Sequence, residues 1–126
     1  MGERVRVDLT DDERELLARG LFEWGGPASP TNEIARLLGF ADVEALNDAG
    51  GSIARNIQSG EPLTPADWRR ALLATELVFA SDLIGSGVDW PMTTGFTDED
   101  SIRLLRSVQR KLARLAREGS APPSPA

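Results

Sequence analysis

The sequence predicts an all-α protein, a single-domain bundle of about five helices around a buried central helix at about residues 65–84. Two features favour this fold class. Apolar residues recur at three- and four-residue spacings along most of the chain, as they do on one face of a helix. Threonines followed by acidic residues, which are typical helix starts, precede several of these stretches. The 126 residues are about the usual length of one domain, so we expect one core.

The first helix is expected to begin after Thr10. Glu13 stands three residues further on, which is the spacing of a capping box, where each side chain accepts a hydrogen bond from the other residue's backbone amide. The acidic residues between them suit the positive end of the helix dipole. The inward face is then expected to comprise Leu16, Leu17, Leu21 and Trp24.

Two further helices are predicted before residue 60. One covers residues 32–38 and ends at Gly39, a residue type that commonly terminates helices. The next covers residues 42–58, but Gly50 and Gly51 lie inside it. Because a glycine costs about 1 kcal/mol in a helix interior, we expect a break or a kink there.

The central helix has the clearest start in the chain. In Thr64-Pro65-Ala66-Asp67 the threonine can cap, the proline suits the first turn, and the aspartate can meet the free amides. The following residues are apolar over a wide arc, which is typical of the buried centre of a bundle. Two adjacent faces are expected to be apolar, one with Trp68, Leu72, Phe79 and Leu83, the other with Leu73, Leu77, Ala80 and Ile84.

The C-terminal part of the chain is expected to hold one more helix. Residues 85–95 are predicted to form a long connection, and Thr97 to cap the last helix. The helical domain should span residues 1–118, and residues 119–126 should form a disordered tail of proline, serine and alanine. The inner face of the last helix is expected to comprise Ile102, Leu105, Val108, Leu112 and Leu115.

The composition removes most catalytic chemistry. The chain has no cysteine, histidine or tyrosine, so it lacks thiolate chemistry, the commonest general base and the commonest metal ligand. We therefore expect a non-enzyme that uses no cofactor and no metal ion. The formal charge of −6 argues against duplex nucleic acid or an anionic membrane as the main partner.

The cellular context follows from equally simple observations. The N-terminal residues lack the hydrophobic stretch of a signal peptide, and no apolar run is long enough to cross a bilayer. A cytoplasmic location is the resulting expectation. Thirteen arginines against one lysine, Lys111, indicate a GC-rich coding genome and favour a bacterial source.

One stretch has the pattern of a helix-turn-helix. Residues 31–40, with Glu-Ile-Ala and Leu-Gly-Phe, and the later Gly60, Thr64-Pro65 and Trp68-Arg69-Arg70 resemble pieces of the AraC-type DNA-binding domain. The resemblance implies that the helix after the Gly-Phe turn enters the major groove and carries basic and aromatic residues. Here residues 41–48 hold three acids and no base, a charge that would repel phosphates.

Six residues are candidates for ligand or partner contacts. Glu76 projects from an apolar region, so it either joins a structural ion pair or hydrogen bond between helices, or faces a ligand. Trp90, next to Asp89 in the predicted connection, either plugs one end of the bundle or anchors a partner. The basic face of the last helix is either simply solvated or binds a partner, and it includes Arg106, Arg110 and Arg114.

Three functional hypotheses follow. The leading one is a non-catalytic protein-interaction or regulatory module whose partner is a protein, with an isologous homodimer through the last helix as one form. The alternative is a small-ligand binder, with a cationic metabolite beside Glu76 and the Trp90 connection as a lid. The weakest is a nucleic-acid-associated factor of the helix-turn-helix kind.

Overall fold

The computed structural model describes residues 3–25, 28, 30–81 and 84–120, with side chains of the last helix described as far as Leu115. This part of the chain holds six α-helices and two short 3₁₀ helices, and it contains no β-strand. The fold class is thus confirmed. In chain order the elements are α1 (Asp11–Phe22), η1 (Glu23–Gly25), α2 (Asn32–Leu37), α3 (Val43–Gln58), α4 (Pro65–Ala80), η2 (Gly87–Asp89), α5 (Trp90–Thr94) and α6 (Asp98–Ser120).

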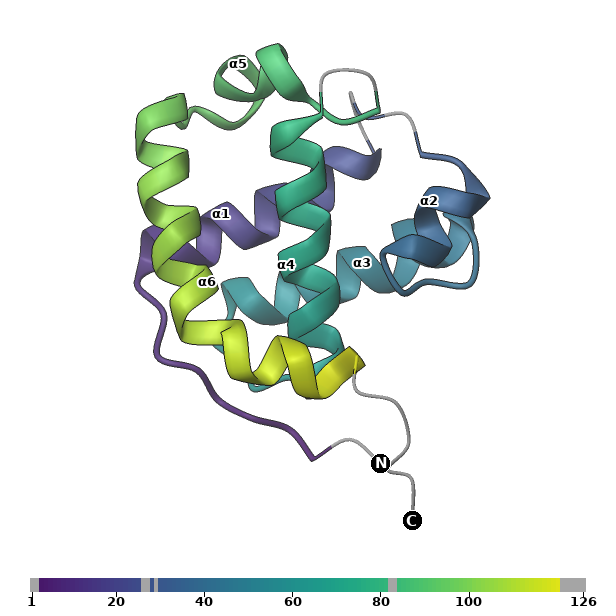
Figure 1. The fold of residues 1–126 in the computed structure, drawn as a ribbon, viewed down its shortest axis with the longest axis vertical. Coiled ribbons are helices and arrows are strands. Elements are labelled where there is room, and N and C mark those ends of the chain that lie inside the picture. Colours follow the sequence, from purple (N-terminus) through teal and green to yellow (C-terminus); the bar gives the residue numbers. More distant parts are fainter. Residues whose placement is uncertain (1–2, 26–27, 29, 82–83, 121–126) are drawn as a thin grey trace.

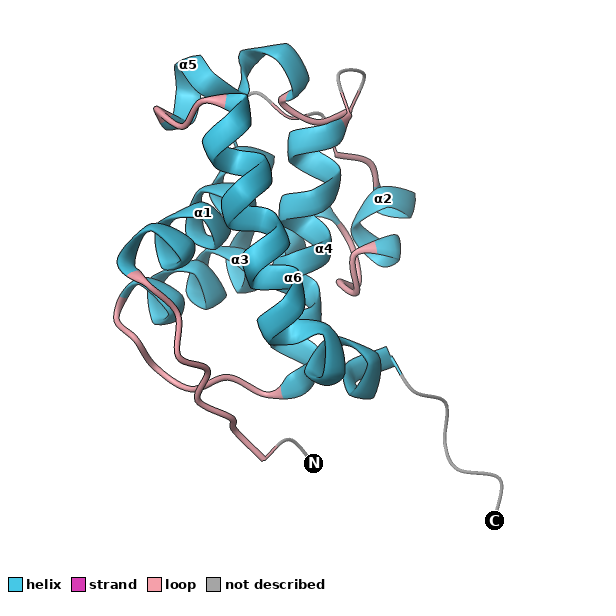
Figure 2. Ribbon diagram, turned by 60° about the vertical axis from the view of Figure 1, so that its left-hand side comes forward, coloured by secondary structure: helices cyan, strands magenta, loops and turns pink. Residues whose placement is uncertain are grey.

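The long helices form two layers. α4 and α6 lie side by side and antiparallel in one layer, and α1 and α3 form the layer behind them (Figure 1). α2 lies beside α4 on the side away from α6, and α5 closes the end of the bundle where α4 stops and α6 begins (Figures 1 and 2). α4 packs against α6, α1 and α3, and so it is the central helix that the sequence predicts.

The helix starts follow the predicted capping residues. Thr10 and Glu13 form the complete capping box, with the Glu13 amide donating to Thr10 Oγ1 at 3.1 Å and the Thr10 amide to Glu13 Oε1 at 2.8 Å. Thr64 caps α4 by accepting from the amide of Asp67, also at 3.1 Å. Side-chain caps of this kind satisfy amides that have no partner within the helix.

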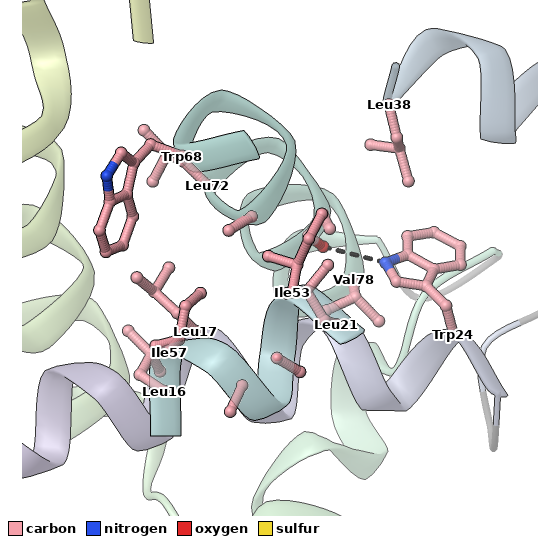
Figure 3. Close-up of a cluster of buried hydrophobic side chains, with 14 of the residues drawn as sticks. Leu16, Leu17, Leu21, Trp24, Leu38, Ile53, Ile57, Trp68, Leu72 and Val78 are labelled. Carbon is pink, nitrogen blue, oxygen red and sulfur yellow. Dashed lines mark hydrogen bonds between the residues drawn. The ribbon is translucent and has the colours of Figure 1, made fainter. Parts of the chain in front are cut away.

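The core lies where α1 crosses between α3 and α4 (Figure 3). Trp24 is 2% exposed, and its indole nitrogen donates to the carbonyl oxygen of Ala74 in α4 at 3.1 Å. Trp68 is equally buried and donates to the carbonyl of Val5 at 2.9 Å, which fixes the N-terminal segment across the end of α4. The apolar residues that fill the space between these two indoles include Leu16, Leu17, Leu21, Ile53, Ile57, Leu72 and Val78.

Two predictions about the chain beyond residue 80 are wrong. α4 ends at Ala80 rather than at about residue 84, because Ser81 is extended and the chain folds back so that the Ser86 amide donates to the Val78 carbonyl at 2.7 Å. Residues 85–95 are not a plain connection, since most of them form η2 and α5. α6 extends to Ser120, and residues 121–126 of the predicted tail, like Leu83, lie outside the described residues.

Two predictions about helix interiors are also wrong. α3 continues as one helix through Gly50 and Gly51. Gly50 is buried beside Leu21 of α1, so burial of this face supports the helix where its intrinsic propensity is low. In α6 the inner face is rotated from the predicted one, since Ile102 is 51% exposed while Leu104 is only 5% exposed.

Candidate functional site

Two grooves run along the outer side of α4. The first, of about 360 Å³, lies between α4 and α2, and the second, of about 320 Å³, lies between α4 and α6. Glu76 and Ala80 line both grooves, so this part of α4 is a ridge with a groove on either side. We call the ridge and its grooves the α4 surface; its residues are Leu37, Leu38, Arg69, Leu73, Glu76, Leu77, Phe79, Ala80, Ile102, Leu105, Arg106 and Gln109.

The α4 surface is mainly apolar. Leu37 of α2 is 64% exposed and Ile102 of α6 is 51% exposed, and they stand on the far sides of the two grooves. Between them Leu73 and Leu77 of α4 are only half-buried. The wide apolar arc of the central helix is therefore not fully covered, and three helices leave large aliphatic side chains facing one open surface.

Glu76 joins α4 to α6. Its Oε2 accepts a hydrogen bond from Gln109 Nε2 at 2.6 Å, and the described residues provide no ion pair for it. This bond between helices is one of the two roles that the sequence left open for Glu76. The carboxylate is half-buried and lines both grooves, and its Oε1 atom accepts no hydrogen bond from the described residues.

Arg69 is the functional candidate that the sequence analysis missed. Its side chain is half-buried in the groove beside α2, and among the described residues it has no hydrogen bond or ion pair. The neighbouring Arg70 differs, because it pairs with Asp67 and donates to the Gly39 carbonyl, both at 2.8 Å. The available signal was the seven-residue spacing between Arg69 and Glu76, which puts both on one side of α4.

The basic residues of α6 do not gather at one site. Arg106 lines the groove beside α4 and donates to Gln109 Oε1 at 2.8 Å. Arg110 is exposed and lines a separate polar cleft between α1 and α6. Arg114 is exposed as well and makes an interaction within the molecule. Of these three arginines, only Arg106 lies at the α4 surface.

Trp90 plugs the end of the bundle. Its side chain is fully buried, its indole nitrogen donates to Ser101 Oγ at 2.7 Å, and its ring meets Phe79 edge to face at 5.6 Å. The structure thus leaves no Trp90 surface for a partner, in agreement with the plug that was one of its two predicted roles. Asp89 is exposed beside it, away from Glu76, so the two candidates do not share a site.

A buried carboxylate that the sequence analysis treated only as a cap joins α1 to α6. Glu13 is 2% exposed and accepts hydrogen bonds from Lys111 Nζ at 2.6 Å and from Ser107 Oγ. Burial raises the pKa of the Glu13 carboxyl, but the hydrogen bonds that it accepts outweigh this effect and lower the pKa to about 2. A carboxylate this acidic is a weak base, so the cluster supports a structural role better than a catalytic one.

A second buried carboxylate holds the cap of the bundle. Glu23 of η1 is 7% exposed, and its Oε1 accepts from Ser86 Oγ and from Thr93 Oγ1, each at 2.6 Å. These bonds join the end of α1 to the segment that carries Trp90. Sequence spacing could not reveal this contact, because Glu23 and Thr93 are 70 positions apart.

The face suggested by the helix-turn-helix resemblance is acidic. α2 and α3 do form two helices around a turn, and Phe40 in the turn is buried. However, the exposed residues in the first turns of α3 include Glu44 and Asp48, and Arg70 is occupied by its own contacts. This charge is unfavourable for a phosphate backbone.

Other kinds of site find no support in the described part of the chain. No group of acidic residues there could hold a metal ion, and no helix there has both the length and the hydropathy needed to cross a bilayer. Comparison with protein-family models, curated proteins and solved structures gives no match to this chain.

Proposed function

We propose that this protein is a non-catalytic protein-interaction module and that its partner binds the α4 surface. The observation that carries the proposal is the exposure of large aliphatic side chains from three helices around two grooves, with Leu37 64% and Ile102 51% exposed. Contiguous apolar surface with a polar edge is typical of protein-binding sites. Grooves between helices suit a partner helix with apolar side chains at three- and four-residue spacing.

The charges of the surface favour a partner that supplies a carboxylate. Arg69 lies half-buried in the first groove without an ion pair among the described residues, so an acidic side chain at that point would gain a partly desolvated partner. Arg106 stands at the second groove. These two cations, together with the bond between Glu76 and Gln109, count against the alternative of a cationic metabolite at Glu76.

The chemistry of the remaining residues supports a non-catalytic role. The chain lacks histidine, cysteine and tyrosine, and the lowered pKa of Glu13 makes it a poor proton acceptor. The acidic start of α3 makes the nucleic-acid hypothesis the least supported of the three.

A display library of amphipathic helical peptides tests the proposal. Peptides selected on the wild-type protein should bind Leu77→Asp at least about tenfold more weakly, because the substitution puts a charge into the groove. Met92→Asp is the matched control, since Met92 of α5 is 89% exposed and lies outside the α4 surface. Equal binding of peptides to the wild type and to Leu77→Asp would contradict the proposal.

A further inference from the structure

We propose that the occupant of the α4 surface is a second copy of this chain, bound through an isologous interface in which the two α4 helices pack antiparallel and Arg69 of each copy pairs with Glu76 of the other. The inference rests on the proposed function and names its partner. It depends on the arrangement of charges and apolar residues along α4.

The charge pattern of α4 is complementary to itself. Arg69 and Glu76 lie on the same side of the helix, seven residues or about two turns apart, which is roughly 10 Å along the axis. When two identical helices pack antiparallel about a two-fold axis near Leu73, each arginine faces the glutamate of the other copy. Both groups are ready for such a pair, because Arg69 has no partner among the described residues and the Oε1 atom of Glu76 accepts no hydrogen bond from them.

The shape of the surface fits the same arrangement. Glu76 and Ala80 form a ridge with a groove on each side. In an isologous dimer with its axis near Leu73, the ridge of one copy lies over the N-terminal half of α4 of the other, beside the groove that Arg69 lines, and the symmetry repeats the contact. α4 of each copy then lies at the centre of the interface, and α6, which carries the exposed Ile102, lies at its edge.

The charges of the α4 surface are matched by a second copy of the same surface. The α4 surface carries charges of both signs, with Arg69 and Arg106 beside Glu76. A surface with charges of only one sign would need a partner of opposite charge. A second copy supplies the same two signs in reversed order. The aliphatic residues that it would cover are those that one copy leaves exposed or half-buried, namely Leu37, Leu73, Leu77 and Ile102.

A charge swap tests the proposal by sedimentation velocity over a concentration series that reaches about 1 mM, where even weak self-association is visible. The wild type should show twice the chain mass of 13.6 kDa. Arg69→Glu and Glu76→Arg should each weaken the dimer about 100-fold, because either one puts like charges together at both ends of the two-fold interface. The double variant Arg69→Glu/Glu76→Arg restores opposite charges and should recover the wild-type dissociation constant to within about fivefold.

Arg55→Glu is the control, since it makes the same charge change at an exposed position of α3 in the opposite layer, and it should leave the dimer unchanged. Far-UV circular dichroism establishes that each variant is folded, and recovery by the double variant excludes a general folding defect. A wild-type monomer at about 1 mM, a dimer that neither single variant weakens, or a double variant that stays monomeric overturns the proposal. The peptide comparison of the wild type with Leu77→Asp then decides independently whether the α4 surface binds another protein.

Discussion

Gly20 of α1 lies directly against Thr75 of α4. A β-carbon placed on Gly20 would come within 2.6 Å of the Thr75 β-carbon and within 2.7 Å of its backbone α-carbon. Thr75 is itself fully buried, and its hydroxyl donates to the Ala71 carbonyl one turn earlier at 2.9 Å. The absence of a side chain at Gly20 therefore sets how closely the two layers approach.

Gly20→Ala should lower the free energy of unfolding by about 2–4 kcal/mol, because the new methyl group forces two buried helix backbones apart. Gly51→Ala is the matched control within α3, where the nearest atom to an added β-carbon is the flexible end of Arg55 at 3.3 Å. That variant should instead gain about 0.5–1 kcal/mol from the better helix propensity of alanine. Urea unfolding measures whether the free energy of unfolding falls in Gly20→Ala and rises in Gly51→Ala. Equal effects in the two variants would contradict the close contact at Gly20.

The stability of the protein should decrease in acid because of Glu13. The pKa of this carboxyl falls from its ordinary value of 4.5 to about 2 on folding, so the folded state holds the charged form more strongly. Its contribution, of about 3 kcal/mol, is full above about pH 5 and is lost as the pH falls toward 2. Urea unfolding should show that Glu13→Gln is much less stable than the wild type at pH 7 and nearly as stable at pH 2. A difference that stays constant with pH would show that Glu13 does not titrate in this range.

Ser101 should be required for the Trp90 plug. In Ser101→Ala the fully buried indole nitrogen of Trp90 loses its acceptor, and this should cost about 1–3 kcal/mol in the free energy of unfolding. Thermal unfolding gives the measurement, and Met92→Ala is the control, because Met92 is 89% exposed in the neighbouring turn and should change stability by less than about 0.5 kcal/mol. Equal midpoints for Ser101→Ala and the wild type would mean that another acceptor serves the indole.

Glu23 should hold the segment that carries Trp90 in place. Glu23→Ala removes the acceptor of two hydroxyl groups, those of Ser86 and Thr93, and so should raise the hydrogen-exchange rate of residues 84–95 at least about tenfold. The amides of α3 should keep their wild-type exchange rates, since the hydrogen bonds that Glu23 accepts come from Ser86 and Thr93 and not from α3. A uniform increase over the whole chain would indicate global destabilisation rather than local release.

The α4 surface shows how far the sequence could lead to the candidate site. Glu76 was identified because a carboxylate among leucines is costly without a partner. Arg69 was missed, because a lone arginine on a helix gives no sign of whether it will find an ion pair. A partner for Arg69 could come only from another helix, because the residues three and four positions away on α4 carry no charge, and tertiary packing brings none among the described residues.

Local interactions in the sequence determined the helix starts and the fold class. Thr10 with Glu13, and Thr64 with Asp67, make bonds across three residues, so their spacing is sufficient to predict them. Helix ends and helix faces were decided by tertiary packing. α3 continues through Gly50 and Gly51 because one face is buried against α1, and Ile102 is exposed because Leu104 turns toward the core instead. The same holds for Glu13 and Glu23, whose partners lie up to 98 positions away and are brought near only by folding.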